Sequence, residues 1–297
     1  LPIWIGLINI PNGHPYIRVR DLNNKRVLEL DNSYEYVDNE TQKVISKYTV
    51  KTGDVVLSIV GTIGLVAIVG RTLDGANLTE NCVKLSSFHG VNRDFLYYYL
   101  RSDCGQQEIR CGTVGAVQAK LPIKNIQNIA INLPDYTTQE RIASLLLSID
   151  RKIELNQKIN DNLEQQAVTY FQELYINNAN PMWQIGTISD LGTVVGGSTP
   201  SKTKPEYYTN NGISWITPKD LSINKSKFIS HGENDITELG LKNSSATVMP
   251  KGTVLFSSRA PIGYIAIASN EVTTNQGFKS VVPYLEIGTA FVYFFLK

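Results

Sequence analysis

The chain has 297 residues, of which 42% are hydrophobic and 19% are charged, and its formal net charge is +1. That length is enough for two domains that each bury a core, and the composition excludes a disordered chain. A charge so close to zero excludes a protein that holds nucleic acid by overall electrostatic attraction, although a specific DNA reader needs only a local basic face.

Three cysteines, Cys82, Cys104 and Cys111, have neither the number nor the spacing of a zinc site. They predict reduced thiols in a cytoplasmic protein. The apolar opening LPIWIGLINI is too short to span a bilayer and has no basic leader, so no membrane partner is expected. The chain starts at Leu1 without a methionine, which suggests that a longer product has been trimmed.

The first part of the chain, residues 1–136, is rich in short strand signals. The run GDVVLSIVGTIGLVAIVG, residues 53–70, predicts two strands joined by a tight turn, because Gly64 can supply the backbone angles that such a turn requires. The run FLYYYL, residues 95–100, is ambiguous between strand and helix. Asn92 and Asp94 are candidate caps, and they favour a short helix.

A long helix is predicted next, over residues 137–175, a stretch without proline or glycine. Thr137 and Glu140 form a capping-box pattern at its start. Residues 137–178 are therefore assigned to a helical spacer. At about 1.5 Å per residue the helix would be roughly 58 Å long, so that two DNA-binding domains joined by it would contact DNA at a set separation of at most about 17 base pairs.

Apolar residues repeat along this helix in steps of four and three, as in a coiled coil. The predicted helix-pairing residues are Ile142, Leu146, Ile149, Ile153, Asn156, Asn160, Leu163, Ala167, Tyr170 and Leu174. The two asparagines at the middle of this seam would fix the register of a partner helix. That partner is a later helix of a longer chain, another chain, or both. Packing against a neighbouring domain is the alternative, and the helix length and the asparagines argue against it.

The last part, residues 179–297, repeats the first. Residues Gly53, Val55, Ser58, Ile63, Gly64, Ala67 and Ile68 recur 199 positions later, and so do Ile17, Asp21 and Leu22. After a small deletion the offset becomes about 195, where Lys84 matches Lys279 and residues 95–101 match 291–297. This indicates an internal repeat of domain size. Both ends look cut, so we infer a window from a longer protein with two full copies.

Sequence signals for catalysis are weak. The motif NPMW, residues 180–183, is superficially similar to the N-P-P-aromatic loop of amino-methyltransferases, but no glycine-rich cofactor loop accompanies it. Residues 192–199 are glycine-rich but lack the lysine of a phosphate loop, so they predict a turn. The three histidines are scattered, and no cluster of carboxylates suits a metal-dependent nuclease. No catalytic residue and no metal site is predicted.

Several segments, in this order along the whole chain, carry a family resemblance. They are GGSTPSKTKPEYYTNNGISWITPKDL, GDVVLSIVGTIG, TENCVKL with TTNQGFK, and LPDYTTQERIASLLLSIDRKIELNQKIN. Together with the duplication and the long helix, they make the chain similar to the specificity subunit of type I restriction-modification enzymes.

This resemblance implies an α+β fold with two homologous target recognition domains joined by a long coiled-coil-like helix. Each domain would read one half of a split site in double-stranded DNA, and the helix would dock methyltransferase (modification) subunits. A motor/endonuclease subunit would join the full complex, and self-association through the helix stays open. The subunit would do no chemistry and hold no cofactor, because S-adenosylmethionine, ATP and Mg are expected on partner subunits. The chain departs from the family pattern in lacking a second long helix, the N-terminal edge of the first domain and the C-terminal part of the second.

Candidate DNA-binding residues are those with hydrogen-bonding or cationic side chains near predicted turns. In the first copy they are Arg18, Arg20, Arg71, Gln118 and Lys120; in the second they are Thr217, Lys219, Ser258, Arg259, Asn275 and Gln276. Arg18 becomes Thr217 and Val60 becomes Arg259 between copies, while glycines and core residues match. One scaffold with two different reading surfaces would give this contrast.

Two alternatives remain at this point. One is the specificity region of a fused single-chain restriction-methyltransferase, whose catalytic domains would lie upstream in frame. The other belongs to a different class, a non-DNA adhesive or carbohydrate-binding repeat protein. A steep fall of DNA affinity with salt would argue against the adhesive protein.

Overall fold

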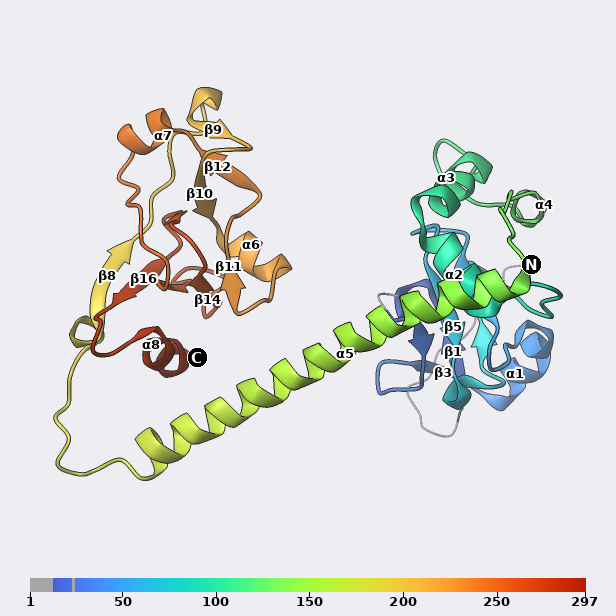
Figure 1. Cartoon of the computed structure of the whole chain (residues 1–297), viewed down its shortest axis with the longest axis horizontal. Coiled ribbons are helices and arrows are strands. Elements are labelled where there is room, and N and C mark those ends of the chain that lie inside the picture. Colours follow the sequence, from blue (N-terminus) through green and yellow to red (C-terminus); the bar gives the residue numbers. More distant parts are fainter. Residues whose placement is uncertain (1–12, 23–24) are drawn as a thin grey trace. The chain divides into compact units, whose positions relative to one another are not determined.

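The computed structural model describes residues 13–22 and 25–297 and divides into two units, residues 1–158 and 159–297 (Figure 1). Each unit combines two small sheets with short helices, which confirms the predicted α+β class. The division falls inside one long helix, α5 (Tyr136–Gln172), so the first unit includes its N-terminal part and the second unit its C-terminal part.

The first unit contains two sheets, with strand orders β3-β1-β6 and β2-β5-β4-β7. Its elements are β1 (His14–Ile17), β2 (Val27–Leu28), β3 (Glu35–Val37), α1 (Asn39–Ile45), β4 (Val55–Ser58), β5 (Val66–Val69), β6 (Asn77–Leu78), β7 (Cys82–Leu85), α2 (Arg93–Arg101), α3 (Asp103–Gly112) and α4 (Ile123–Gln127), with 3-10 helices at Val19–Leu22, Ser46–Tyr48 and Arg71–Leu73.

The predicted hairpin of the first unit is confirmed. Strands β4 and β5 pair antiparallel, and all of their residues are buried. The connecting turn needs glycine because Gly64 has φ +92°. The Ser58 hydroxyl fixes this turn by donating to the Thr62 carbonyl (2.6 Å) and accepting from the Leu65 amide (2.8 Å). The hairpin therefore forms the centre of the unit, with apolar clusters on both of its faces.

The ambiguous aromatic run is helical, as favoured from its caps. The Asn92 side chain accepts a hydrogen bond from the Phe95 amide (3.0 Å), which identifies Asn92 rather than Asp94 as the cap of α2. Leu96, Tyr97 and Leu100 of this helix are buried against β4 and β5.

Helix α5 spans Tyr136–Gln172 and continues as a π-helical turn, Glu173–Asn177. The predicted capping box of Thr137 and Glu140 is wrong. Asp135 caps the helix instead, accepting from the Thr138 amide (3.0 Å) and hydroxyl (2.6 Å). The buried Gln139 side chain then bonds the Asn92 amide at 2.8 Å and the Gly90 carbonyl at 3.1 Å, which sets where the helix begins on its unit.

The second unit contains a four-stranded sheet, β15-β10-β12-β9, and a five-stranded sheet, β11-β14-β13-β16-β8. Its elements are β8 (Gly192–Gly196), β9 (Tyr208–Thr209), β10 (Ile213–Ile216), α6 (Pro218–Ile223), β11 (Phe228–Ile229), β12 (Asn234–Ile236), α7 (Glu238–Lys242), β13 (Val254–Phe256), β14 (Ile265–Ala268), β15 (Thr273–Thr274), β16 (Lys279–Pro283) and α8 (Thr289–Leu296), with 3-10 helices at Ile188–Asp190 and Pro205–Tyr207.

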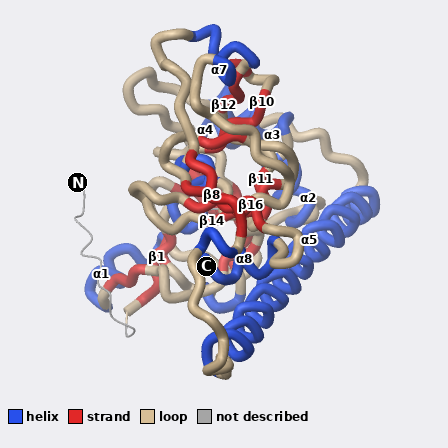
Figure 2. The backbone as a smooth tube through the Cα atoms, turned by 90° about the vertical axis from the view of Figure 1, so that its left-hand side faces the viewer, coloured by secondary structure: helices blue, strands red, loops and turns tan. Residues whose placement is uncertain are grey.

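The prediction of a turn over residues 192–199 is wrong for most of that stretch. Residues Gly192–Gly196 form strand β8, which pairs antiparallel with β16 over five residues. Figure 2 shows β8, β16 and β14 together, with α8 beside them. The strand forms because it pairs with β16, which lies more than 80 residues later in the sequence. Local turn signals contain no information about so distant a partner.

The internal repeat extends to the sheets. The order β3-β1-β6 of the first unit matches β12-β10-β15 of the second, with the same strand directions. The order β2-β5-β4-β7 likewise matches β11-β14-β13-β16. The register corrects the second offset. Val55 pairs with Leu85 in the first unit and Val254 pairs with Val281 in the second, so the offset after the deletion is 196 rather than 195. Lys84 therefore corresponds to Ser280, and the match of Lys84 with Lys279 is wrong.

Helix α5 packs on the second unit through side chains that face α8. Glu164 binds Lys227 at 2.6 Å and Lys297 at 2.5 Å, and the ring of Phe171 lies 5.4 Å from that of Phe291. The two lysines also lie over the ring of the buried Tyr293. The Glu164 pKa is lowered: desolvation by burial, the largest single effect, acts to raise it, but the hydrogen bonds and charges of the two lysines together outweigh it.

Candidate nucleic-acid interface

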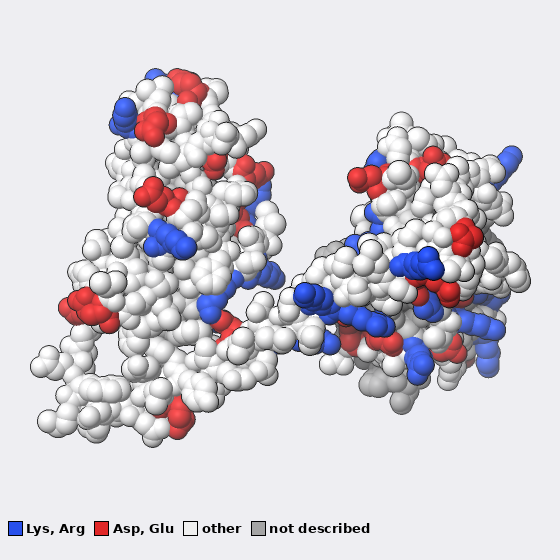
Figure 3. Space-filling view, in the orientation of Figure 1, with Lys and Arg blue, Asp and Glu red and all other residues white. Residues whose placement is uncertain are grey.

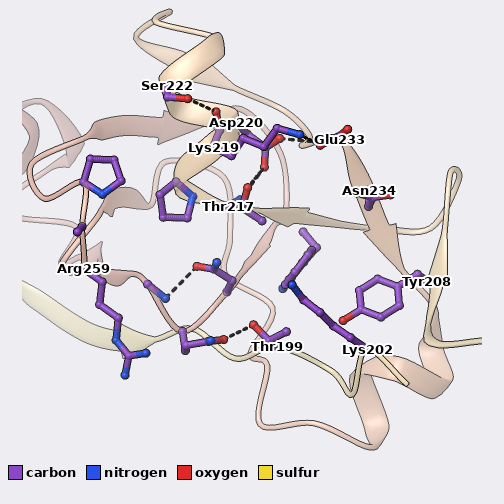
Figure 4. A pocket seen from close by; sticks show the side chains of 17 residues that line it. Thr199, Lys202, Tyr208, Thr217, Lys219, Asp220, Ser222, Glu233, Asn234 and Arg259 are labelled. Carbon is purple, nitrogen blue, oxygen red and sulfur yellow. Dashed lines mark hydrogen bonds and ion pairs between the residues drawn. The ribbon is translucent and has the colours of Figure 1, made fainter. Parts of the chain in front are cut away.

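A cleft of about 870 Å³ in the second unit gathers most of the residues predicted there to bind DNA (Figure 4). Thr217, Lys219, Arg259, Asn275 and Gln276 all line it. They come from the start of α6, the loop after β13 and the loop after β15. The cleft thus combines amide and guanidinium groups, which read base edges, with a lysine and a threonine suited to phosphates.

The start of α6 is held by a buried carboxylate. Asp220 Oδ2 accepts from the Thr217 amide (2.7 Å) and hydroxyl (2.6 Å), and its Oδ1 accepts from the Glu233 amide (2.9 Å). These bonds fix the wall of the cleft that carries Thr217 and Lys219. They also occupy the Thr217 hydroxyl proton, so this side chain offers a ligand only an acceptor.

Removing this carboxylate is expected to weaken the whole wall. Asp220→Ala would leave the amides of Thr217 and Glu233 unpaired, and we expect it to lower the free energy of unfolding of the second unit by about 1–3 kcal/mol. Denaturant titration followed by Trp215 fluorescence, in a background with Trp4→Phe and Trp183→Phe, measures the loss. Ser222→Ala is the matched control, because it removes only a hydroxyl that bonds Lys219 within the same helix. Equal losses for both variants would contradict the assigned role of Asp220.

The cations of the cleft differ in their availability. Lys219 pairs with Glu233 at 2.5 Å, and this hydrogen bond raises the Lys219 pKa, but both side chains are about 60% exposed. Such a pair is worth little in water and can be exchanged for a phosphate. The described part of the second unit forms ion pairs at Lys219, Lys227 and Lys297, and Arg259 takes part in none of them. Arg259 is exposed, and its guanidinium extends freely in Figure 4.

The amides of the cleft are oriented by the protein. Asn275 Oδ1 accepts from the Gly277 amide at 2.9 Å, and the Thr199 hydroxyl bonds the Gln276 side chain. The remaining predicted residue, Ser258, lies beside the cleft, where its hydroxyl bonds the Gly277 carbonyl at 3.3 Å. Ser258 therefore helps to shape the loop that carries Arg259.

Among the lining residues that sequence reasoning missed are Lys202, Tyr208 and Asn234. Lys202 lies in the Ser-Lys-Thr-Lys run after β8, which is a basic signal next to a glycine-rich turn. Tyr208 and Asn234 begin strands β9 and β12, and nothing in the sequence places these strands beside the loop of Arg259.

In the first unit, Arg18 and Arg20 are engaged with carboxylates. Arg18 lies 2.5 Å and Arg20 2.8 Å from Glu35, and only 19% of the Arg18 side chain is exposed. The Arg18 amide donates to Asp21 at 2.7 Å, as the Thr217 amide does to Asp220. Burial raises the Asp21 pKa to about 6, while the neighbouring Arg20 acts against this rise. Arg18 therefore supports the turn after β1, and contact with DNA would require it to leave Glu35.

The other residues predicted in the first unit lie on separate loops. Arg71 begins a 3-10 helix, and Gln118 and Lys120 are exposed in the loop before α4. The backbone of Lys120 forms an isolated antiparallel β-bridge with Val60, which is the counterpart of Arg259. The first unit thus places a lysine close to the position where the second unit carries its free arginine.

The predicted helix-pairing residues of α5 are largely uncovered by their own units. Ile142, Ile149, Ile153, Leu163, Tyr170 and Leu174 each expose more than a third of their surface, from 38% to 67%. Asn156 and Asn160 are exposed as well, and only Leu146 and Ala167 are partly buried. The residues that pack on the two units, such as Gln139 and Glu164, lie outside this seam. An apolar stripe of this size favours a partner.

Charge is not concentrated on the face of the molecule in Figure 3, where acidic and basic side chains are interspersed. Among residues 13–22 and 25–297, no group of three His, Cys, Asp or Glu side chains could hold a metal ion. Over the same ranges no helix has both the length and the apolar character needed to cross a bilayer.

A family profile described as "Type I restriction modification DNA specificity domain" matches residues 8–165 and 180–297. The chain belongs to this family. Each matched range contains most of one copy of the internal repeat, and the first range also extends into α5, so the duplication is a duplication of this DNA specificity domain. The family membership bears out the resemblance inferred from the motifs.

Curated relatives carry the same description. The chain is 46% identical over 129 residues to the type I restriction enzyme MjaIX specificity subunit of Methanocaldococcus jannaschii, covering 43% of this chain and 30% of the relative. It is 22% identical over 262 residues to the HindI specificity subunit of Haemophilus influenzae, covering 64% and 56%. The chain thus spans 30% and 56% of the length of these two relatives.

A solved structure supports the fold. The type I restriction-modification S subunit from M. genitalium has a TM-score of 0.51 and 16% identity, and the likeness covers 97% of this chain and 70% of the other. At this identity the likeness concerns the arrangement of the elements alone.

Proposed function

We propose that the chain recognises double-stranded DNA as the specificity component of a type I restriction-modification complex. Each unit reads one half of a bipartite site, and the cleft of the second unit contacts one of these halves. The observation that carries the proposal is the convergence of Arg259, Asn275 and Gln276 in one cleft. Arg259 forms no ion pair in the described part of the second unit. Two differently surfaced copies of one scaffold fit two different half-sites.

The exposed seam of α5 supports the second part of the proposal. A partner helix buries the seam, and the resulting helix pair provides the surface for methyltransferase subunits, with a motor/endonuclease subunit in the full complex. The chain itself performs no chemistry in this proposal. S-adenosylmethionine, ATP and Mg act on the partner subunits, and the complex works in the cytoplasm. The specificity-subunit names of the relatives favour this function over an adhesive repeat protein.

Arg259→Ala tests the role of the cleft. A bidentate arginine to guanine contact discriminates by about 1–3 kcal/mol, so we expect the variant to lose roughly 5- to 150-fold in affinity for duplexes that carry the preferred second half-site. Selection from a random duplex pool, followed by titration at several salt concentrations, measures this loss.

Lys251→Ala is the matched control, because Lys251 is an exposed cation just before β13 that does not line the cleft. It should retain the sequence preference. An equal loss of affinity for every sequence in Arg259→Ala would assign Arg259 to a phosphate. Affinity that does not fall steeply with salt would contradict DNA binding altogether.

A further inference from the structure

Three charged side chains of the first unit occupy the positions that line the cleft in the second unit. At the offset of 199, Arg18, Arg20 and Glu35 correspond to Thr217, Lys219 and Asn234, all of which line the cleft. The strand register agrees, because Tyr16 lies opposite Glu35 and Trp215 lies opposite Asn234. The three charged residues, here called the Arg-Glu-Arg triad, therefore lie where the first unit would contact DNA.

Each oxygen of the Glu35 carboxylate binds a different arginine. Oε2 lies 2.5 Å from Arg18 Nη1, and Oε1 accepts from Arg20 Nη2 at 2.8 Å. Arg18 is mostly buried, whereas 57% of the Arg20 side chain and 27% of the Glu35 side chain are exposed. A carboxylate oxygen can accept more than one hydrogen bond, and a guanidinium has further N–H groups. Arg20 and Glu35 therefore present donors next to an acceptor that a ligand can reach.

Two arginine donors followed by a carboxylate acceptor complement the major-groove edge of a G·C base pair. That edge offers the guanine N7 and O6 acceptors and then the cytosine N4 amino donor. O6 and N4 are joined by an N–H···O hydrogen bond, so they lie about 2.9 Å apart, close to the 2.8 Å between Arg20 and Glu35. An A·T pair offers an acceptor, a donor and an acceptor, so one arginine donor would face the adenine amino group.

The arginines also allow a carboxylate to approach DNA. A lone carboxylate would be repelled by the phosphates, but Glu35 is paired with two cations. The scaffold itself does not require this carboxylate. The second unit keeps the buried turn carboxylate, Asp220 for Asp21, and forms the same strand pairing with the neutral Asn234 in place of Glu35.

We propose that Glu35 is a specificity-determining residue of the first unit, which accepts a hydrogen bond from the N4 amino group of a cytosine while Arg20 binds the paired guanine. Arg18 holds the carboxylate in position from the buried side. This inference rests on the proposed reading of DNA by the first unit and assigns a G·C pair to its half-site. At the corresponding position the second unit carries Asn234, a side chain that suits adenine.

Glu35→Gln tests the assignment with little change of shape. Selection with the unmodified chain defines the first half-site, and duplexes with a constant second half-site then carry G·C or A·T at each position in turn. At one position the unmodified chain should prefer G·C by about 5- to 150-fold. The glutamine amide can also bind adenine, so the variant should reduce this preference to about threefold or less and leave the other positions unchanged.

Glu40→Gln is the matched control. It removes the same charge from the same unit, but Glu40 is exposed on α1 and lies outside the Arg-Glu-Arg triad. This variant should keep every base preference of the unmodified chain.

A modified base keeps the test independent of how the variant folds. N4-methylcytosine still pairs with guanine, but its methyl group replaces the amino hydrogen that faces the major groove. At the assigned position it should lower the affinity of the unmodified chain at least about fivefold and that of Glu35→Gln less than about twofold. The matched modification is 5-methylcytosine, which adds a methyl group to the same groove and keeps the amino hydrogen, so the unmodified chain should tolerate it.

The proposal is overturned if Glu35→Gln leaves the base preferences unchanged, or if it changes the affinity for all sequences alike. In either case Glu35 would only hold the arginines. Equal losses with the two methylated cytosines would also overturn it, because the effect would then be steric. If the unmodified chain shows no preference at all in the first half-site, the proposed function of the first unit fails, and this inference fails with it.

Discussion

Phe278→Ala is expected to lower the free energy of unfolding of the second unit by about 3–5 kcal/mol. Phe278 has no exposed surface and packs in one core with Ile216, Met249 and Leu255. The alanine variant loses the ring's transfer free energy and leaves a cavity that the surrounding sheets cannot easily fill. Since domains of this kind are stable by about 5–15 kcal/mol, much of the unit's stability depends on this one ring.

The other copy of the repeat supplies the matched control. Cys82 corresponds to Phe278 and is also buried, but it is far smaller, so Cys82→Ala should cost the first unit only about 1 kcal/mol. Chemical denaturation in a background with Trp4→Phe and Trp183→Phe resolves the two cases, because Trp215 emission then reports the second unit and far-ultraviolet circular dichroism reports both. Similar losses in the two variants would contradict the large contribution assigned to the Phe278 ring.

Local signals predicted the elements that local physics controls. Gly64 and its repeat Gly263 both have φ near +91°, so the glycine that predicts the hairpin turn is the residue that the turn requires. Helix α5 was predictable from its unbroken periodicity. Its start was not, because Asp135 and Thr137 are both good capping residues. The buried bonds of Gln139 to Asn92 and Gly90 determine which of them caps the helix.

Elements that depend on distant partners were not predictable in the same way. The sequence of β8 predicts a turn because its glycines are poor strand formers. The segment is a strand because it pairs with β16. The offset of 195 rested on one lysine match, whereas the register of β4 with β7 requires 196.

The candidate site shows the same limit. Arg259 could be proposed from the contrast with Val60. The engagement of Arg18 by Glu35 needs the antiparallel pairing of β1 and β3, in which Tyr16 lies opposite Glu35. Sequence patterns therefore predicted which residue types the site uses, and tertiary pairing determined which of them are free.

Lengthening α5 by one heptad is expected to change the spacing of the DNA site that the chain prefers. Duplicating Ile153–Ile159 keeps both columns of the seam in phase and adds about 10.5 Å of helix, which corresponds to about three base pairs. If α5 sets the distance between the two half-site contacts, the preferred gap should increase by that amount. Affinity for the original spacing should fall by two orders of magnitude or more, because only one unit can then engage.

Selection from duplexes with both half-sites and a variable gap measures this shift. A seven-residue Gly/Ser insertion at the same point is the matched control, because it adds length without helix and should give a broad range of accepted gaps rather than a new preferred one. An unchanged preferred gap in the heptad variant would show that α5 does not act as a spacer. In that case the exposed seam would still need a partner, because Ile149 and Ile153 remain half-exposed on their own unit, and the spacing would have to be set by whatever covers them.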